Sequence, residues 1–134
     1  MRRQHLWLIG VTAAGVLAAS VAMFAPERSA CAQQQRAVSY AEDIVPIFRG
    51  YCMGCHQPGG QGYQASGFDL TTYESLMRGT RFGRMVIPGE PDMSNIVQLI
   101  EGRAQMRMPY GHRPLPNCLR QEIWSWIFQG ARNN

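Results

Sequence analysis

Apolar residues recur three or four positions apart in four stretches of the chain, and this spacing predicts four helices. The stretches cover residues 39–56, 72–78, 93–102 and 117–130. The last stretch has the clearest apolar face, which consists of Leu119, Ile123, Trp126 and Ile127. The segments between the helices are rich in Gly and Pro and predict loops at residues 56–67, 80–92 and 103–116. The pattern therefore indicates a mostly α-helical domain with a helix near each end.

Two residues compete as the N-cap of the first helix. Ser39 and Glu42 fit a capping box, but Pro46 would then lie deep in the helix, where it removes a hydrogen bond. An N-cap at Asp43 places Pro46 in the first turn, where the missing N–H does no harm. We expect the helix to begin at Asp43.

The ends of the other helices also carry signals. Thr71 and Glu74 fit a second capping box. Ser94 or Asp92 can cap the third helix, and Asn117 can cap the last one. We expect the three helices to end at Gly79, near Gly102 and at Gly130.

The first 32 residues differ in character from the rest of the chain. A short basic start precedes an apolar stretch at residues 6–24, and Ala30-Cys31-Ala32 fits the small-residue pattern that signal peptidases cut. We predict a signal peptide over residues 1–32 and a periplasmic or otherwise exported domain over residues 33–134. The alternative is a retained membrane anchor at residues 6–24, because a segment of this length can just span a bilayer. Membrane contact is expected only in that case.

The charge of the predicted domain is small. Ten arginines and eight acidic residues follow residue 32, and lysine is absent from the sequence. The resulting net charge of about +2 is too weak and too scattered for a nucleic-acid-binding surface.

Cys52, Cys55 and His56 form a C-x-x-C-H string, which has three interpretations. A zinc site needs about four ligands, and the remaining candidates, Cys118 and His112, are not a second clustered pair. A redox dithiol would begin a helix after a strand, whereas a predicted helix precedes these cysteines. The same string is the attachment signature of c-type haem. On a helix, positions i, i+3 and i+4 share one face, so both thiols and the imidazole could meet one macrocycle. We therefore predict one covalent haem c, attached through Cys52 and Cys55 with His56 as an iron ligand.

The second iron ligand is expected opposite His56. Methionine is the usual choice in electron carriers. Met106 and Met108 precede the last helix, and His112 offers a bis-histidine alternative. Spacing does not choose between the methionines, but Pro109 favours an extended and stiff presentation of Met108.

Several longer stretches of the sequence resemble a known protein family. They are "IVPIFRGYCMGCH", "GFDLTTYESLMRG", "VIPGEPDMSNIVQLIEG", "MRMPYGHRPLP" and "IWSWIFQGA". Together they resemble the small single-haem cytochromes c, and most closely the planctomycete-type domains. The resemblance implies a compact fold in which the N- and C-terminal helices cross over the haem edge. It also implies that Met108 is the distal ligand.

These features predict electron transfer rather than enzyme activity. An iron with both axial positions filled can change oxidation state but cannot bind a substrate. The expected partners are redox donor and acceptor proteins. Arg81, Arg84, Arg107 and Arg113 could pair with haem propionates. Two alternatives remain: a haem subunit of a larger membrane or periplasmic redox complex, and a haem peroxidase or gas sensor with a labile distal ligand.

Overall fold

The computed structural model describes residues 36–134, so the predicted signal peptide and its cleavage point lie outside the described residues. The elements in chain order are the π-helix η1 (Tyr40–Ile44), α1 (Val45–Tyr51), α2 (Gln61–Ser66), α3 (Tyr73–Arg78), the 3-10 helix η2 (Pro91–Met93), α4 (Asn95–Glu101) and α5 (Asn117–Phe128). The described part contains no strand, only an isolated bridge between Thr80 and Gly83. The expected mostly α-helical class is thereby confirmed. None of the helices within residues 36–134 has the length and apolar character needed to cross a membrane.

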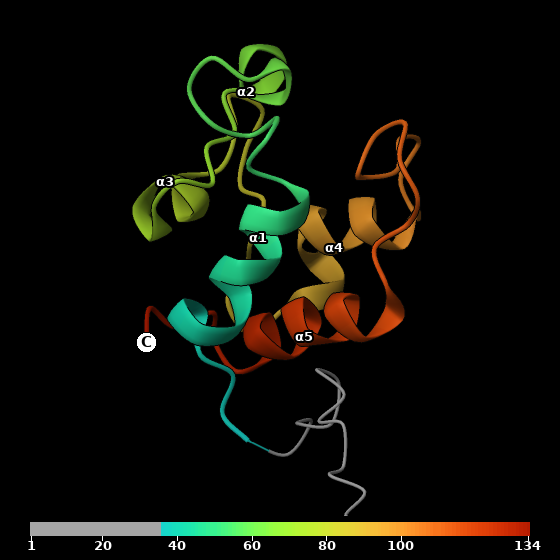
Figure 1. Cartoon of the computed structure of the whole chain (residues 1–134). Helices are drawn as coiled ribbons and strands as arrows, with labels where there is room; N and C mark the ends of the chain where they lie inside the picture. Colours follow the sequence, from blue (N-terminus) through green and yellow to red (C-terminus); the bar gives the residue numbers. More distant parts are fainter. Residues whose placement is uncertain (1–35) are drawn as a thin grey trace, which may run out of the picture.

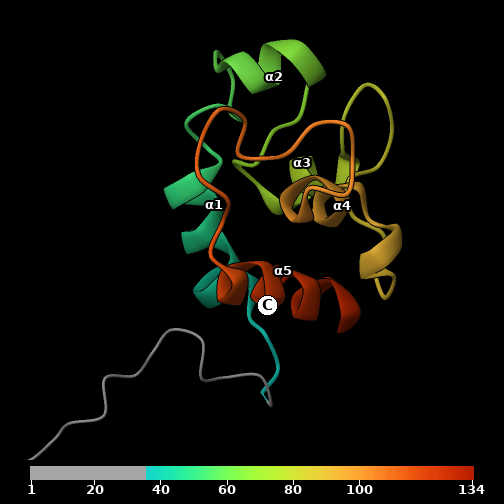
Figure 2. The same ribbon diagram turned by 90° about the vertical axis from the view of Figure 1, so that its right-hand side faces the viewer.

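The first and last helical segments pack against each other at the base of the molecule. Figures 1 and 2 show α1 rising steeply from η1, with α5 running beneath it. The ring of Tyr40 lies 5.5 Å from that of Trp126, centroid to centroid, and joins η1 to α5. The apolar face predicted for the last helix is confirmed, since Ile123, Trp126 and Ile127 are buried and Leu119 packs against the same core.

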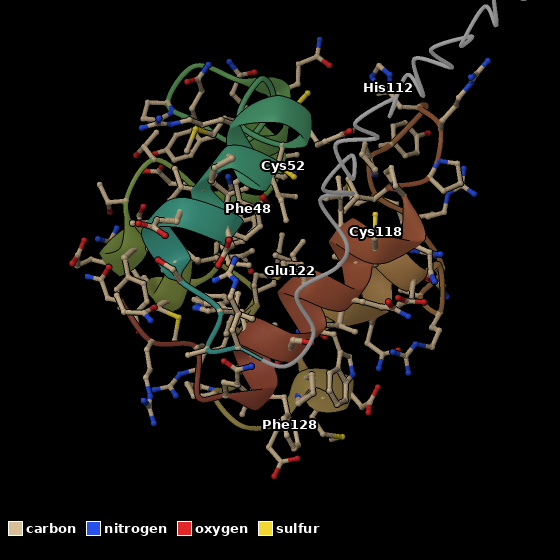
Figure 3. The ribbon with its side chains drawn as sticks, turned by 60° about the horizontal axis from the view of Figure 1, so that its bottom comes forward. Phe48, Cys52, His112, Cys118, Glu122 and Phe128 are labelled. Atoms are coloured by element: carbon tan, nitrogen blue, oxygen red, sulfur yellow. The ribbon has the colours of Figure 1, made fainter. Side chains whose placement is uncertain are left out.

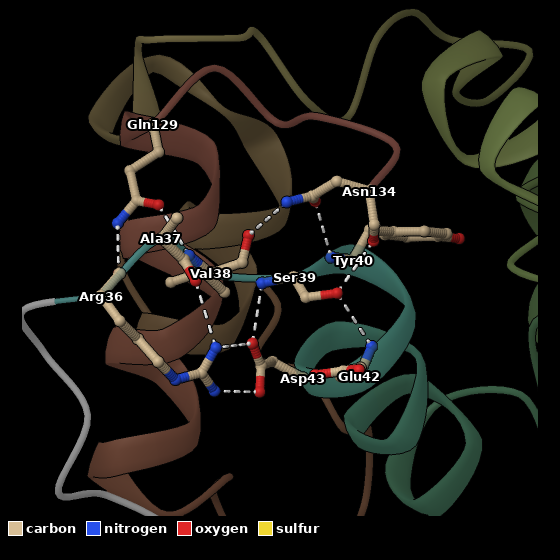
Figure 4. A network of polar contacts seen from close by, with 9 residues as sticks. All are labelled: Arg36, Ala37, Val38, Ser39, Tyr40, Glu42, Asp43, Gln129 and Asn134. Atoms are coloured by element: carbon tan, nitrogen blue, oxygen red, sulfur yellow. Dashed lines mark hydrogen bonds and ion pairs between the residues drawn. The ribbon is translucent and has the colours of Figure 1, made fainter.

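A polar seam ties the segment before η1 to the end of the chain (Figure 4). The side chain of Gln129 accepts a hydrogen bond from Val38 N at 2.8 Å. The Asn134 side chain accepts one from Tyr40 N at 3.0 Å, and its main-chain oxygen accepts one from Ala41 N at 3.0 Å. Backbone groups that precede the first helix are therefore satisfied by residues more than 90 positions away.

The start of the first helix differs from the expectation. Ser39, not Asp43, is the N-cap: its hydroxyl accepts a hydrogen bond from Glu42 N at 3.2 Å. The Asp43 carboxylate instead accepts a bond from Ser39 N at 2.7 Å and pairs with the Arg36 guanidinium. Pro46 still lies in the first turn of α1, because η1 is a wide π-turn that ends just before it. A proline is tolerated in the first turn of an α-helix, where its missing N–H does least harm.

The first helix also ends earlier than expected, at Tyr51 rather than at residue 56. Cys52 N and Met53 N both donate to Phe48 O, at 2.9 and 2.8 Å, which ends the regular ladder. Residues 52–56 continue as hydrogen-bonded turns. His56 N still donates to Cys52 O at 3.0 Å, so the helix-like spacing between these two residues is kept.

Other helix boundaries follow the sequence with two corrections. The predicted loop at residues 56–67 contains α2, which ends at Gly67 in the left-handed conformation. The N-terminal cap of α3 is a Thr72–Ser75 capping box rather than Thr71–Glu74. The helix ends at Gly79 and Gly102 are confirmed.

The predicted caps of the last two helices are correct in one position and wrong in the other. Ser94 is the N-cap residue of α4, but its hydroxyl makes no capping bond; it accepts a hydrogen bond from Ile87 N and donates one to Glu90 O, each at 2.9 Å. Asn117 is the first residue of α5 rather than its cap. The Ser94 side chain hydrogen-bonds to the preceding loop, and the Asn117 side chain hydrogen-bonds within the first turn, so neither side chain caps its helix.

Candidate cofactor site

The C-x-x-C-H string forms a closed set of turns at the top of α1. Tyr63 N donates to Cys55 O at 3.0 Å, and Leu70 N donates to His56 O at 2.9 Å. Both ends of the α2 segment are therefore fixed to the string, one through Cys55 and the other through His56. Cys52 and Cys55 are free thiols, with Cys52 half-buried and Cys55 exposed.

The imidazole of His56 is held between a glycine and an aromatic ring. The ring of Phe68 lies edge-on at 5.4 Å between centroids. Gly62 is so close that a Cβ atom there would come within 2.6 Å of His56 Cε1. The Nδ1 atom of His56 is buried and has no hydrogen-bond partner in the described part of the chain. A buried polar atom without a partner is unusual in a folded protein. It indicates that a further group binds beside the ring or that the ring shifts slightly to reach a partner.

Burial sets the protonation of these groups. It lowers the pKa of His56 below its ordinary value, although an interaction with the Phe68 backbone opposes part of the shift. The ring is therefore neutral at neutral pH, which is the form that binds a metal. Burial, with a smaller effect of Cys55, raises the pKa of the Cys52 thiol to about 11. A thiol that stays protonated is a poor zinc ligand and a poor redox nucleophile.

Two adjoining cavities open beside the string. The larger has a volume of about 440 Å³ and the smaller about 300 Å³, both of the size that cofactors occupy. They share seven lining residues: Cys52, His56, Gly62, Ala65, Ile100, Met106 and Met108. Cys55 lines the smaller cavity, so that cavity gathers all four predicted site residues.

The cavity walls are apolar and carry no charged side chain. The large one is lined by six large apolar side chains: Phe48, Phe68, Leu70, Ile96, Leu99 and Ile123. The polar residues that reach it are uncharged: Ser66, Thr80, Asn95 and Gln98. A flat apolar group with its polar edge turned outward suits such a wall better than a polar substrate does.

Three methionines reach the cavities. Met108 is half-buried, lines both of them and is anchored to α4, because its N–H donates to Leu99 O at 3.0 Å. Met106 lines both as well but is 47% exposed. Met85 is buried and lines only the larger one, a position that no sequence pattern predicts. Burial and anchoring favour Met108 over Met106 as a ligand of fixed position.

His112 and Arg113 are placed differently. His112 is exposed and lines neither of these two cavities, and Figure 3 places it on the loop before α5, away from Cys52. The bis-histidine alternative therefore has no support from the geometry, and neither does a distal His–Arg pair for peroxide chemistry. Within residues 36–134, no three side chains of His, Cys, Asp or Glu gather closely enough to hold a metal ion, so zinc has no support either.

Glycine and alanine on α2 are the functional positions that the sequence did not reveal. Gly62 and Ala65 line both cavities, on a helix that we expected to be loop. Their small side chains leave the space beside the His56 ring open. A Gly-x-x-Ala pattern six residues after the attachment string could have indicated this, since residues three apart share one face of a helix.

Residues 52–109 match the family model described as Planctomycete cytochrome C. The match confirms the resemblance of this segment to the planctomycete-type cytochromes c. No curated protein and no solved structure matches the chain significantly. The matched segment begins at Cys52 and ends at the residue after Met108, so it contains the four predicted site residues.

The residues present at this site fit haem c. Two free thiols and a neutral imidazole stand on one closed turn at the edge of an apolar cavity. The imidazole has a buried nitrogen without a partner and a glycine against its face, so nothing bulky blocks the ring. Met108 and Met106 line the same cavity and offer a thioether sulfur.

Proposed function

We propose that the protein is an exported electron-transfer protein with one haem c, attached through Cys52 and Cys55 and ligated by His56 and Met108. The observation that carries this proposal is the smaller cavity, whose wall brings the C-x-x-C-H turn and the anchored Met108 together without a charged side chain. The match to the planctomycete cytochrome c family supports a haem-based electron-transfer role.

Each residue has a separate task in this proposal. Haem c, when bound, supplies an iron that accepts and releases one electron. The thiols of Cys52 and Cys55 fix the macrocycle at the top of α1, and the neutral His56 imidazole provides a nitrogen donor. The Met108 thioether, held by Leu99 O, provides a soft sulfur that favours the ferrous state.

The apolar cavity wall limits the access of water to the cofactor. The buried side chains of Phe48, Phe68 and Leu70 exclude water from the wall that they form, and no carboxylate lines the larger cavity. An apolar environment disfavours the extra positive charge of the oxidised state and so raises the reduction potential. If His56 and Met108 both hold the haem iron, the protein would carry electrons and would need no catalytic residue of its own.

Location and partners complete the proposal. Covalent attachment of haem c is expected after export, with residues 1–32 removed as a signal peptide. The partners are redox donor and acceptor proteins.

Optical spectra of the exported wild-type protein and three single variants test the ligand assignment. We expect a low-spin spectrum for the wild type, with the far-red sulfur-to-iron band in the ferric form. Met108→Ala should lose this band, become partly high-spin and have a lower potential. Met106→Ala and Met85→Ala are the matched controls and should keep the band.

The outcomes separate ligand choice from function. Loss of the band in Met106→Ala with its retention in Met108→Ala would transfer the role to Met106. A wild-type protein without haem absorbance would reject the function altogether. A high-spin ferrous protein that binds carbon monoxide at once and turns over peroxide would favour a haem enzyme.

A further inference from the structure

The four cysteines of the chain divide into two pairs. Cys52 and Cys55 are free thiols on the turn that would hold the haem. Cys118 is disulfide-bonded, so its role is different. Because neither thiol of the attachment turn is its partner, the sequence leaves one candidate within the chain, Cys31. Cys31 lies outside the described residues, but the position of the neighbouring described residues decides whether it can reach Cys118.

The described chain begins beside the C-terminal end of α5 (Figure 4). The Gln129 side chain, at that end, accepts a hydrogen bond from Val38 N at 2.8 Å and donates one to Arg36 O at 3.4 Å. Cys118 is the second residue of α5, and Figure 3 shows it at the opposite end of this helix from Phe128. The segment that precedes Arg36 therefore starts at one end of α5, and Cys118 lies at the other.

The distance along α5 matches the length of chain available. Cys118 and Gln129 are eleven positions apart, which corresponds to about 17 Å at the helical rise per residue. Cys31 precedes Arg36 by five positions, and an extended chain covers about 17 Å in five residues. A disulfide joins Cα atoms that are themselves about 5.5 Å apart, which adds to the reach. The segment is therefore long enough to bring Cys31 to Cys118.

Cys118 lies on the face of α5 that the start of the described chain approaches. Glu122 follows Cys118 by one helical turn, so the two side chains share a face. Burial raises the pKa of Glu122 above its ordinary value, the Asp43 carboxylate adds to the rise, and the Arg36 guanidinium opposes it. Arg36 is therefore close enough to act on the charge of Glu122, on the side of the helix that bears Cys118. The Cys118 side chain is only half-buried, so a residue outside the core can reach it.

We propose that a disulfide joins Cys31 to Cys118 and fastens the segment before Arg36 to the start of α5. Its formation removes two protons and two electrons from the two thiols. An exported protein that carries an oxidising disulfide takes up both by thiol–disulfide exchange, and its own disulfide becomes two thiols. The new bond closes a loop of roughly 90 residues, which contains the whole cofactor site.

This pairing separates the tasks of the four cysteines. With Cys31 and Cys118 joined, no other thiol of the chain competes for Cys52 and Cys55 before haem is attached. The inference rests on export, as the proposed function does, but it moves one boundary. A cut after Ala32 would remove Cys31, so the cut must lie before Cys31, or the chain keeps its N-terminal segment as a membrane anchor. The haem site and its ligands stay as proposed.

Peptide mapping of the exported holoprotein tests the pairing. Free thiols are alkylated with iodoacetamide as the cells are opened, and the protein is digested with trypsin without a reductant. Cleavage at arginine places Cys31 in the peptide that ends at Arg36. It places Cys118 in the peptide of residues 108–120, because trypsin does not cut before Pro114. We expect these two peptides to be linked and to separate on reduction.

Three results would overturn the pairing: an N-terminus at Gln33, an alkylated Cys118 in the unreduced protein, or a Cys118 peptide linked to a second copy of itself. Haem content is read separately, from the optical spectrum. Linked peptides in a protein without haem would reject the proposed function and confirm the disulfide. Haem in a protein with alkylated Cys118 would do the reverse.

Serine variants separate a cross-link from simple packing. Cys31→Ser and Cys118→Ser should each lower the unfolding temperature of the holoprotein by roughly 10 °C, since the long loop is no longer closed in the unfolded chain. The double variant should lose no more than either single variant, because both changes break the same bond. Ser29→Ala is the matched control and should leave the temperature unchanged. A loss in Cys118→Ser without a loss in Cys31→Ser would assign Cys118 to helix packing and refute the cross-link.

Discussion

Replacing Gly62 by alanine tests whether α2 positions the His56 ring. The new Cβ would lie 2.6 Å from His56 Cε1, 2.8 Å from Nδ1 and 2.9 Å from Nε2. Ordinary contacts between such atoms begin near 3.4 Å, so either the ring or α2 must move by about half an ångström or more. The glycine thus holds open the space that the imidazole occupies.

The expected energy follows from two opposing effects. Alanine is the better helix former by up to about 1 kcal/mol, although less so in the first turn of a short helix such as α2. Forcing an extra methyl group into a packed contact costs about 1–3 kcal/mol. The steric effect is larger, so Gly62→Ala should destabilise the holoprotein.

Gly50→Ala is the matched control. Gly50 lies in α1, and a Cβ there would meet nothing within 4 Å. This variant should be as stable as the wild type or more stable by about 0.5–1 kcal/mol. Thermal unfolding of the two holoproteins, followed by circular dichroism, compares them directly, since 1 kcal/mol corresponds to roughly 4–8 °C in a domain of this size.

Spectroscopy separates a displaced ligand from a general loss of stability. Gly62→Ala should also change the ferric spectrum and the reduction potential, whereas Gly50→Ala should leave both unchanged. Equal stability and identical spectra for the two variants would refute the idea that α2 sets the position of His56.

Two other predictions concern the base of the molecule. Asp43→Asn should lower stability by about 1 kcal/mol at neutral pH, because the carboxylate is hydrogen-bonded to Ser39 N and paired with Arg36. These partners lower the pKa of Asp43 below its ordinary value of 3.8, so its contribution is present above that pH and lost as the pH falls through the folded-state pKa. The gap between variant and wild type in urea titrations should close under acid conditions; a gap independent of pH would contradict the ion pair. Trp126→Ala should lower the free energy of unfolding by about 3–5 kcal/mol, because the ring is fully buried. Phe128→Ala should lower it by less than about 1 kcal/mol, because Phe128 is 60% exposed at the outer end of α5 (Figure 3). Similar losses of stability in the two variants would contradict the packing of η1 on α5.

The sequence was sufficient where the signal is local and strong. The spacing of Ile123, Trp126 and Ile127 predicts the buried face of α5, and Gly79 and Gly102 end their helices because glycine readily adopts positive φ. The C-x-x-C-H string likewise predicts a site, because few other chemistries use this spacing. The turn that carries it lies where a cofactor cavity opens.

The sequence failed where distant residues decide local structure. The six-residue helix α2 is too short to be stable by itself, and it forms because Tyr63 N reaches Cys55 O and Gly62 packs on His56. Asp43 looked like a cap, but Arg36 and Ser39 N take its carboxylate. Neither partner can be inferred from helix propensity, which describes isolated segments.

The position of Met85 illustrates the same limit for the site. Nothing in its neighbourhood along the chain distinguishes it from a packing methionine. It reaches the larger cavity because its carbonyl accepts a hydrogen bond from Ile96 N at 3.0 Å, which brings this loop against α4. A cavity assembled from α1, α2, α4, α5 and the segments between them becomes visible only in three dimensions.

The mass of the exported protein after denaturation and solvent extraction tests the central claim most directly. The account predicts a polypeptide heavier than its amino-acid sequence by one haem, with the added mass lost only when both Cys52 and Cys55 are replaced. A mass equal to that of the bare polypeptide, from cells that attach haem to other C-x-x-C-H proteins, would contradict it.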